Sequence, residues 1–139
     1  MTITIINKLK KADNGTSTDI WHKSVLNDCV IDKRSHSQQA GTTLNIGQSI
    51  SLIIPEYGNK AYKAYREWRY LAKDLYYTAS ENDIIVIGEI AEDVTSANVT
   101  AMLKDYESYH IRLVDDRRNA IGLKGKLSKY ASHIYIEGV

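Results

Sequence analysis

The apolar run "DIIVIGEI", residues 83–90, constrains the fold more than any other stretch of this chain. It follows the turn-forming sequence "SEND", is rich in β-branched residues and is too short for a buried helix. We therefore predict a strand that lies near the centre of a sheet. Alternation of apolar and polar residues predicts further strands at 2–8, 109–116 and 132–139.

Turn-forming residues predict how the first strands connect. Asn14 and Gly15 form a dipeptide that is typical of hairpin turns, so residues 2–8 are expected to pair with residues 19–33. Two polar residues at 27–28 are expected to split the second stretch into two strands.

Two stretches are predicted to be long exposed loops. Residues 34–43 are almost entirely polar, and residues 117–130 combine glycine with lysine and arginine. Between them, residues 44–55 are predicted to form a strand that Gly47 interrupts with a bulge or a turn.

Two further segments have a helical period. In residues 59–77, small and aromatic residues recur at spacings of three and four, which predicts an amphipathic helix. The density of tyrosine and tryptophan there also suits an extended segment. Residues 95–108 are predicted to form a short helix that Thr95 or Ser96 caps.

Together these elements predict a single domain, residues 1–139, that is mainly β. The expected architecture is a small antiparallel barrel or sandwich with one or two short helices and long loops, because regular alternation of strands and helices is absent. No apolar run reaches the ~20 residues of a membrane span. No signal peptide is predicted, and a single cysteine suits a reducing compartment such as a cytoplasm.

No catalytic residue, metal site or cofactor is predicted. The four histidines lack H-x-x-x-H spacing, and Cys29 lies in an apolar run that is typical of a buried side chain. The sequence contains no G-x-S-x-G element, P-loop or G-x-G-x-x-G motif. We therefore expect a protein that is not an enzyme, with a hydrolase or metalloenzyme built from distant loops as an open alternative.

The stretch "LVDDRRNAIGLKGKLSKY", residues 113–130, carries the densest charge pattern. Asp115 and Asp116 would bind Mg²⁺ if further carboxylates joined them. Arg117 and Arg118, with the lysines that follow, would contact phosphate without base specificity or pair with acidic residues of a partner subunit. The two acidic and two basic residues would also neutralise one another at the end of a strand. The sequence leaves these interpretations open.

Three segments carry a resemblance to a known class of proteins. They are "YKAYREWRYL" at 62–71, "YYTASENDIIVIGEI" at 76–90 and "IRLVDDRRN…SHIYIEGV" at 111–139. The motifs in chain order are Glu67-Trp68, Tyr77-Thr78, Asn82-Asp83, Gly88-Glu89, Asp116-Arg117-Arg118 and His133 to Gly138. Together they resemble the small minor capsid or head-to-tail connector proteins of tailed phages and prophages of Gram-positive bacteria. The order "DDRRN" departs from the D-N-R-R order of that class.

The resemblance implies a structural protein of the virion neck that is assembled in the host cytoplasm. Such proteins form a ring, expected here as a hexamer or dodecamer, between the portal or adaptor ring and the tail or tail-terminator proteins. The ring closes or lines the channel for double-stranded DNA, which it contacts without sequence specificity. The near balance of 18 basic and 17 acidic residues agrees with this expectation, because the channel must let DNA pass. No membrane partner is expected.

The contact residues expected from this resemblance lie in stretches 34–43 and 117–130. They are Arg34, His36, Gln38, Arg117, Arg118, Lys124 and Lys126. The alternative function is binding of single-stranded nucleic acid by a small β-barrel. In that case Trp21, Tyr109 and Tyr135 would stack on bases beside a basic groove.

Overall fold

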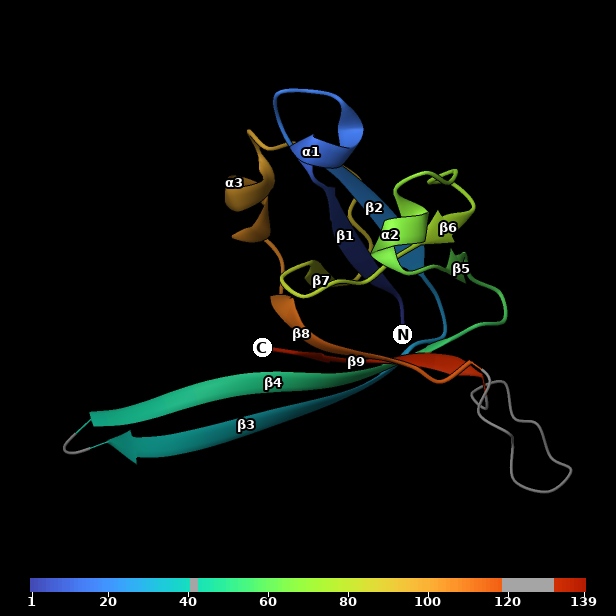
Figure 1. Ribbon diagram of the computed structural model, residues 1–139. Helices are drawn as coiled ribbons and strands as arrows, with labels where there is room; N and C mark the ends of the chain where they lie inside the picture. The colour runs from blue at the N-terminus through green and yellow to red at the C-terminus, as the bar shows by residue number, and fades with distance from the viewer. Residues whose placement is uncertain (41–42, 119–131) are drawn as a thin grey trace, which may run out of the picture.

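The fold is dominated by one antiparallel sheet. The computed structural model describes the backbone of residues 1–40, 43–118 and 132–139, and the side chains of these residues except 35–47. Within this part the sheet has seven strands in the order β2-β1-β7-β8-β9-β4-β3 (Figure 1). The strands are β1 (Ile3–Leu9), β2 (Ile20–Leu26), β3 (Val30–Ala40), β4 (Thr43–Pro55), β7 (Ile84–Ile87), β8 (Ser108–Asp116) and β9 (His133–Gly138). The mainly β prediction is confirmed.

Strands β1 and β2 form the predicted hairpin with a continuous antiparallel register. Their connection is longer than a two-residue turn and contains the helical turn α1 (Lys11–Asn14), which ends at Gly15 with φ +72°. Glycine adopts this left-handed conformation without the steric cost of a Cβ atom. The Asn14 amide donates to the carbonyls of Leu9 and Thr18, at 3.0 Å each, and so holds the loop closed.

The sheet folds over on itself, and its two halves enclose the main hydrophobic core. The core side chains include Ile3 and Ile5 of β1, Ile50, Leu52 and Ile54 of β4, Ile85 of β7, Tyr109 and Ile111 of β8, and Ile134 and Ile136 of β9. Burial of each aliphatic side chain contributes ~1.5–3 kcal/mol before entropy is counted. Among the described residues β2 and β3 are the two ends of the sheet and do not pair. The sheet is therefore not a closed barrel, whereas the sandwich alternative fits.

A smaller second core covers the outer face of β1 and β7. It combines Ile6, Ile84 and Val86 of the sheet with Ile90, Val94, Val99 and Met102 of the segment that follows β7. That segment contains α3 (Val99–Leu103), so the helix predicted over 95–108 is wrong in length. Thr95 is not the N-cap; instead Thr95 and Asn98 exchange side-chain to backbone hydrogen bonds of 2.8 and 3.3 Å in the turn before the helix.

Residues 59–77 do not form the predicted amphipathic helix. Only α2 (Tyr65–Trp68) is helical there, and β5 (Ala61–Tyr62) pairs in parallel with β6 (Tyr76–Tyr77) around it. The helix ends early because the segment folds back over Trp68, which is 1% exposed. The helices of the described residues are all short, and none is long and apolar enough to span a membrane.

Residues 34–43 also differ from the prediction, because the described part of this stretch belongs to a long hairpin and not to an exposed loop. Along their described residues β3 and β4 pair without a register shift, so the bulge predicted at Gly47 is absent. We call the outer part of this hairpin, residues 35–40 and 43–48, the arm. Figure 1 shows the arm projecting from the body of the protein. A polar sequence indicates exposure to solvent, and a two-stranded ribbon is exposed without being a loop.

A buried polar network fixes the turn that precedes β7. The Asp83 carboxylate accepts hydrogen bonds from the Asn7 amide at 2.9 Å and from the Ser80 backbone N–H at 3.0 Å. The same Asn7 amide donates to the Thr78 carbonyl at 2.7 Å. Burial raises the pKa of Asp83, against the effect of these hydrogen bonds. The Asn-Asp turn of the sequence therefore joins β1 to the start of β7.

Candidate functional site

Each arginine of the predicted contact set whose side chain the structure describes pairs with the aspartate two residues before it. The pairs are Asp32–Arg34, Asp115–Arg117 and Asp116–Arg118, with N–O distances of 3.1, 2.8 and 2.7 Å. Asp32 and Arg34 are alternate residues of β3 and lie on the same face. Arg117 and Arg118 follow the end of β8, and their side chains reach back to Asp115 and Asp116. The acidic and basic residues at 115–118 therefore neutralise one another, which was one of the open interpretations.

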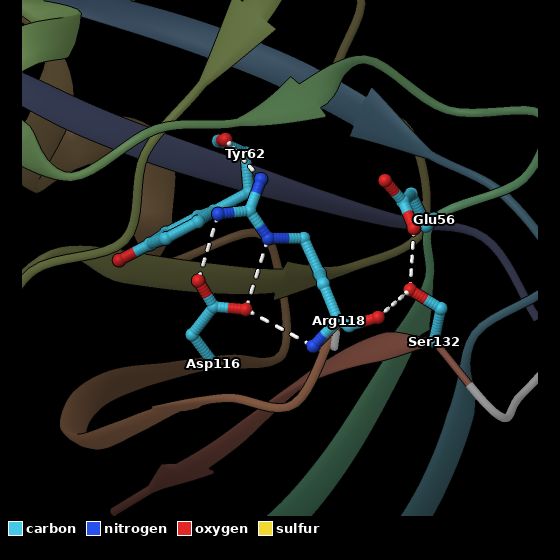
Figure 2. Close-up of polar contacts among 5 residues, drawn as sticks. All are labelled: Glu56, Tyr62, Asp116, Arg118 and Ser132. Carbon is cyan, nitrogen blue, oxygen red and sulfur yellow. Dashed lines mark hydrogen bonds and ion pairs between the residues drawn. The ribbon is translucent and has the colours of Figure 1, made fainter. Parts of the chain in front are cut away.

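Arg118 is the centre of the densest of these contacts, at the end of β8 (Figure 2). Its Nε and Nη2 atoms bind the two oxygens of Asp116 at 2.9 and 2.7 Å, and its backbone N–H also donates to Asp116, at 3.1 Å. Nη1 donates to the carbonyl of Tyr62 at 2.8 Å, and the guanidinium lies 5.1 Å from the centre of that ring. Arg118 thus joins β8 to β5.

The same cluster continues to the start of β9. The Ser132 hydroxyl lies within hydrogen-bonding distance of the Arg118 carbonyl oxygen, at 2.5 Å, and of the Glu56 carboxylate, and it donates to one of them at a time. The backbone adds a bond from the Arg117 N–H to the His133 carbonyl at 3.0 Å. These contacts hold Arg118 and Ser132 together, and these two residues flank the segment 119–131. We call Glu56, Tyr62, Asp116, Arg118 and Ser132 the Arg118 cluster (Figure 2).

The ion pair changes the protonation of its partners in the expected directions. Hydrogen bonds from Arg118 lower the pKa of Asp116, and the carboxylate in turn raises the pKa of the guanidinium. The Arg118 side chain is 25% exposed, and each of its three guanidinium nitrogens donates to an internal acceptor. It therefore acts as a structural tie and is a poor candidate for direct contact with DNA.

Arg117 and Arg34 are more accessible. The Arg117 guanidinium lies 4.5 Å from the centre of the Tyr135 ring and its side chain is 45% exposed. Arg34 lies on β3 with a side chain that is 72% exposed. An arginine that stacks on a ring and pairs with one carboxylate retains free N–H groups for a further acceptor. These two residues therefore remain available for contact with a partner.

The other predicted contact residues are placed only in part. His36 and Gln38 are alternate residues of β3 with Arg34, so the three positions share one face of that strand. Lys124 and Lys126 lie outside the described residues, as does most of the predicted basic loop 117–130.

The residues considered for catalysis or metal binding do not assemble into a site in the described part. Cys29 is buried at 3% exposure, and burial raises the pKa of its thiol to about 12, so the sulfur is protonated and unreactive at neutral pH. No group of three or more histidine, cysteine or acidic residues in the described part is arranged to hold a metal ion. Asp115 and Asp116 instead pair with arginines.

The aromatic residues proposed for base stacking are not displayed together. Tyr109 is 5% exposed and belongs to the main core, so it offers no face to a base. Tyr135 is covered by Arg117, and the Trp21 indole N–H donates to Ser96 at 3.2 Å. The structure therefore does not bring Trp21, Tyr109 and Tyr135 into one stacking surface.

Three members of the Arg118 cluster were not expected from the sequence. Tyr62 contacts Arg118, and Glu56 contacts Ser132, only through the tertiary fold, since 56 and 76 residues of chain separate the two pairs. The pairing of Asp with Arg two residues later was the only local signal, and it identified Asp116 and Arg118.

Comparison with known proteins places the chain in a family. Residues 1–139 match the family described as "Family of unknown function (DUF6751)", and the chain belongs to this family. No curated protein matches the chain. No solved structure matches it either.

Proposed function

We propose that this chain is a non-enzymatic structural subunit of the neck of a tailed phage or prophage. In this role a ring of copies joins the portal or adaptor ring to the tail and helps to close or line the DNA channel. The resemblance of residues 62–71, 76–90 and 111–139 to connector proteins supports the proposal. The observation that carries it is the arm, since a projecting ribbon on a β-sandwich suits a protein that acts by assembly.

The hydrogen bonding of the arm explains why it is suited to assembly. Residues Ile50–Ile53 of β4 pair with β3 on one side and with β9 on the other, whereas Thr43–Ser49 pair only with β3. A two-stranded ribbon is marginally stable alone in water. Its outer edges also offer backbone N–H and C=O groups that a further strand would satisfy. Contact with a neighbouring subunit or ring would therefore stabilise the arm.

The charge arrangement supports a channel protein that lets DNA pass. Arg34, Arg117 and Arg118 each have an aspartate partner, so the described arginines of the contact set form no net positive surface by themselves. Weakly held phosphates slide, whereas a dense array of unpaired cations would retain them. In the proposed role the accessible Arg34 and Arg117 contact DNA or an adjacent ring without reading its sequence.

The role is tested by imaging particles made after disruption of the gene. Packaged heads that leak DNA and fail to bind tails are the expected result. Intact joined virions would overturn the neck assignment. A more specific test uses a variant with a shortened arm. In this variant a two-residue Asn-Gly turn between Ser35 and Gln48 replaces residues 36–47, which keeps the register of the remaining hairpin.

The shortened variant separates folding from assembly. Its circular dichroism spectrum and unfolding midpoint are expected to stay close to those of the full chain, because the core residues of β4 begin at Ile50. Complementation of the disrupted gene with this variant is expected to fail. Joined, infectious virions from a folded shortened variant would show that the arm is not the assembly element.

A further inference from the structure

The segment around α3 forms an acidic flank of the molecule. Residues 88–107 contain five acidic residues and one basic residue. Four of the acidic side chains are exposed and form no ion pair with any residue that the structure describes. They are Glu89, Glu92, Asp93 and Asp105. Carboxylates without ion-pair partners attract a cationic surface over the Debye length of about 8 Å at physiological salt.

An apolar hollow opens beside this flank. It has a volume of about 480 Å³, and Trp21, Ile84, Val99 and Leu103 line it, with Lys104 at its rim. The hollow lies where α3 meets the outer face of the sheet, next to the second core. An apolar hollow with a charged rim is a common receptor for an apolar side chain from a partner.

The segment from Tyr57 to Tyr77 has the opposite character. Residues 59–77 contain five basic residues and two acidic ones. Lys60 and Lys73 donate to backbone carbonyls, as when Lys60 donates to the Lys73 carbonyl at 2.9 Å, and neither forms an ion pair with a described residue, whereas Arg69 pairs with Asp13 at 3.0 Å. Tyr57, Tyr70 and Leu75 are 83, 76 and 61% exposed, and they are three of the four most exposed large hydrophobic side chains in the described part.

The two flanks lie on opposite sides of the body. Tyr62 and Tyr77 of the basic flank pack on the inner core, whereas Val99 and Met102 of the acidic flank pack on the outer face of the same sheet. Figure 1 shows α2, β5 and β6 on one side of β1 and β2, and α3 on the other. The flanks of one copy therefore cannot meet, but those of two copies can.

We propose that the basic flank of one copy docks on the acidic flank of a second copy, with Leu75 and Tyr70 inserting at the apolar hollow beside α3. Opposite charges attract in this head-to-tail arrangement, whereas like flanks of two copies repel. A contact between two different surfaces is heterologous and leads to rings or filaments. This inference rests on the proposed ring function, because the docking would supply the contacts between neighbouring subunits of the ring.

Sedimentation velocity of the full chain tests the docking directly. Association is expected to increase with protein concentration and to weaken between about 50 mM and about 500 mM salt, because the charged rims are screened. Leu75→Glu is expected to weaken self-association at least about tenfold, since it places a charge in an apolar contact. The matched control is Leu113→Glu, an exposed leucine of β8 that is 44% exposed and lies outside both flanks.

A mixing experiment identifies the contact as heterologous. L75E has a weakened basic flank, and the double variant E92K/D105K has a weakened acidic flank, so each alone is expected to be monomeric at a concentration at which the wild type associates. An equimolar mixture is expected to form a one-to-one dimer, because one good surface of each kind remains. A wild-type chain that stays monomeric at low salt, equal weakening by L113E, or a mixture that stays monomeric would overturn the docking surfaces.

The outcome of this experiment is independent of the outcome of the gene-disruption test of the neck role. Self-association in solution that depends on Leu75 supports the docking surfaces even where gene disruption leaves virions intact. Conversely, broken virions after gene disruption, together with a monomeric wild-type chain, would overturn the docking surfaces and leave the neck role standing.

Discussion

Arg118 and Asp116 form a two-bond ion pair at the end of β8, with Nε–Oδ1 and Nη2–Oδ2 distances of 2.9 and 2.7 Å. The planar guanidinium matches the carboxylate, which makes this geometry stronger than a single contact. The third bond, to the Tyr62 carbonyl, links the pair to β5. Arg117, one residue earlier, makes one bond to Asp115 and is more exposed. Neighbouring arginines of similar sequence context therefore have different structural roles.

Replacement of Arg118 by alanine is expected to reduce the free energy of unfolding by about 1–2 kcal/mol, after allowance for partial exposure of the pair. Arg117→Ala is the matched control and is expected to cost less than about 1 kcal/mol, because its ion pair is well solvated. Arg118→Lys restores the charge but not the two-bond geometry and is expected to recover only part of the loss. Urea unfolding measures all three. Equal losses for the two alanine variants would contradict the structural role of Arg118.

The stabilisation by this pair is expected to depend on pH. Arg118 lowers the pKa of Asp116 below its ordinary value of 3.8, so the folded state holds the carboxylate charged more firmly than the unfolded state does. The contribution is therefore complete above that value and is lost as the pH falls through the folded-state pKa. The difference in unfolding free energy between wild type and R118A is expected to be constant from about pH 5 to 8 and to shrink below about pH 4. A difference that grows in acid would exclude this linkage.

The sequence predicts a structural feature well where the cause is local. The run at 83–90 contains the interior strand β7, because a short β-branched run has few alternatives. The pairing of Asp116 with Arg118 is also local, since the two residues lie two positions apart where β8 ends, and the Arg118 backbone N–H bonds to the same carboxylate. The contact of Arg118 with Tyr62 does not, because it depends on how β5 and β8 meet in the tertiary fold.

Residues 59–77 and the arm show why the remaining predictions were wrong. In 59–77 the spacing of aromatic residues matched a helix, but Trp68 and Tyr77 are separate anchors of a segment that folds back on itself. The polar composition of 34–43 did not distinguish a loop from a ribbon. Periodicity and polarity report on which residues are buried, and the backbone conformation is then decided by pairing partners elsewhere in the chain.

His22 is expected to make the protein less stable in mild acid. Burial, with Lys73 and Lys60 nearby, lowers the pKa of His22 below its ordinary value of 6.5. Between the folded-state pKa and 6.5 the unfolded chain binds a proton that the folded chain does not, so stability falls as the pH drops below 6.5. His22→Phe keeps an aromatic edge against Trp68, which lies 5.7 Å away between ring centres, and removes the proton site. The wild type is expected to lose stability relative to H22F between about pH 7 and 5, and parallel curves would contradict this origin.

A side chain at Gly138 is expected to destabilise the fold. A Cβ atom at this position would lie 3.2 Å from Ile50 Cγ1 and from Tyr109 Cβ, and 3.3 Å from the His110 carbonyl oxygen. These neighbours belong to the packed core and to a strand backbone, so they cannot move aside freely. Gly138→Ala is therefore expected to lower the free energy of unfolding by about 1–3 kcal/mol through overpacking. Val139→Ala, at the exposed next position, is the control and is expected to lie within about 0.5 kcal/mol of wild type. Equal unfolding midpoints for wild type and G138A would refute the crowding.

Hydrogen exchange is expected to divide β4 into two parts in the isolated protein. The backbone of Ile50–Ile53 lies between β3 and β9, whereas Thr43–Ser49 pair only with β3. A two-stranded ribbon is marginally stable alone in water, so the outer part should open with a smaller free energy than the body. Amides of 43–48 are thus expected to exchange faster than those of 50–54 when measured by mass spectrometry of peptic fragments.

In assembled particles the same outer amides are expected to become protected, because a neighbouring subunit satisfies the edges of the arm. Protection of 43–48 that is already as high as that of 50–54 in the monomer would show that the arm is stable without a partner, and would remove the physical reason for placing it at an interface.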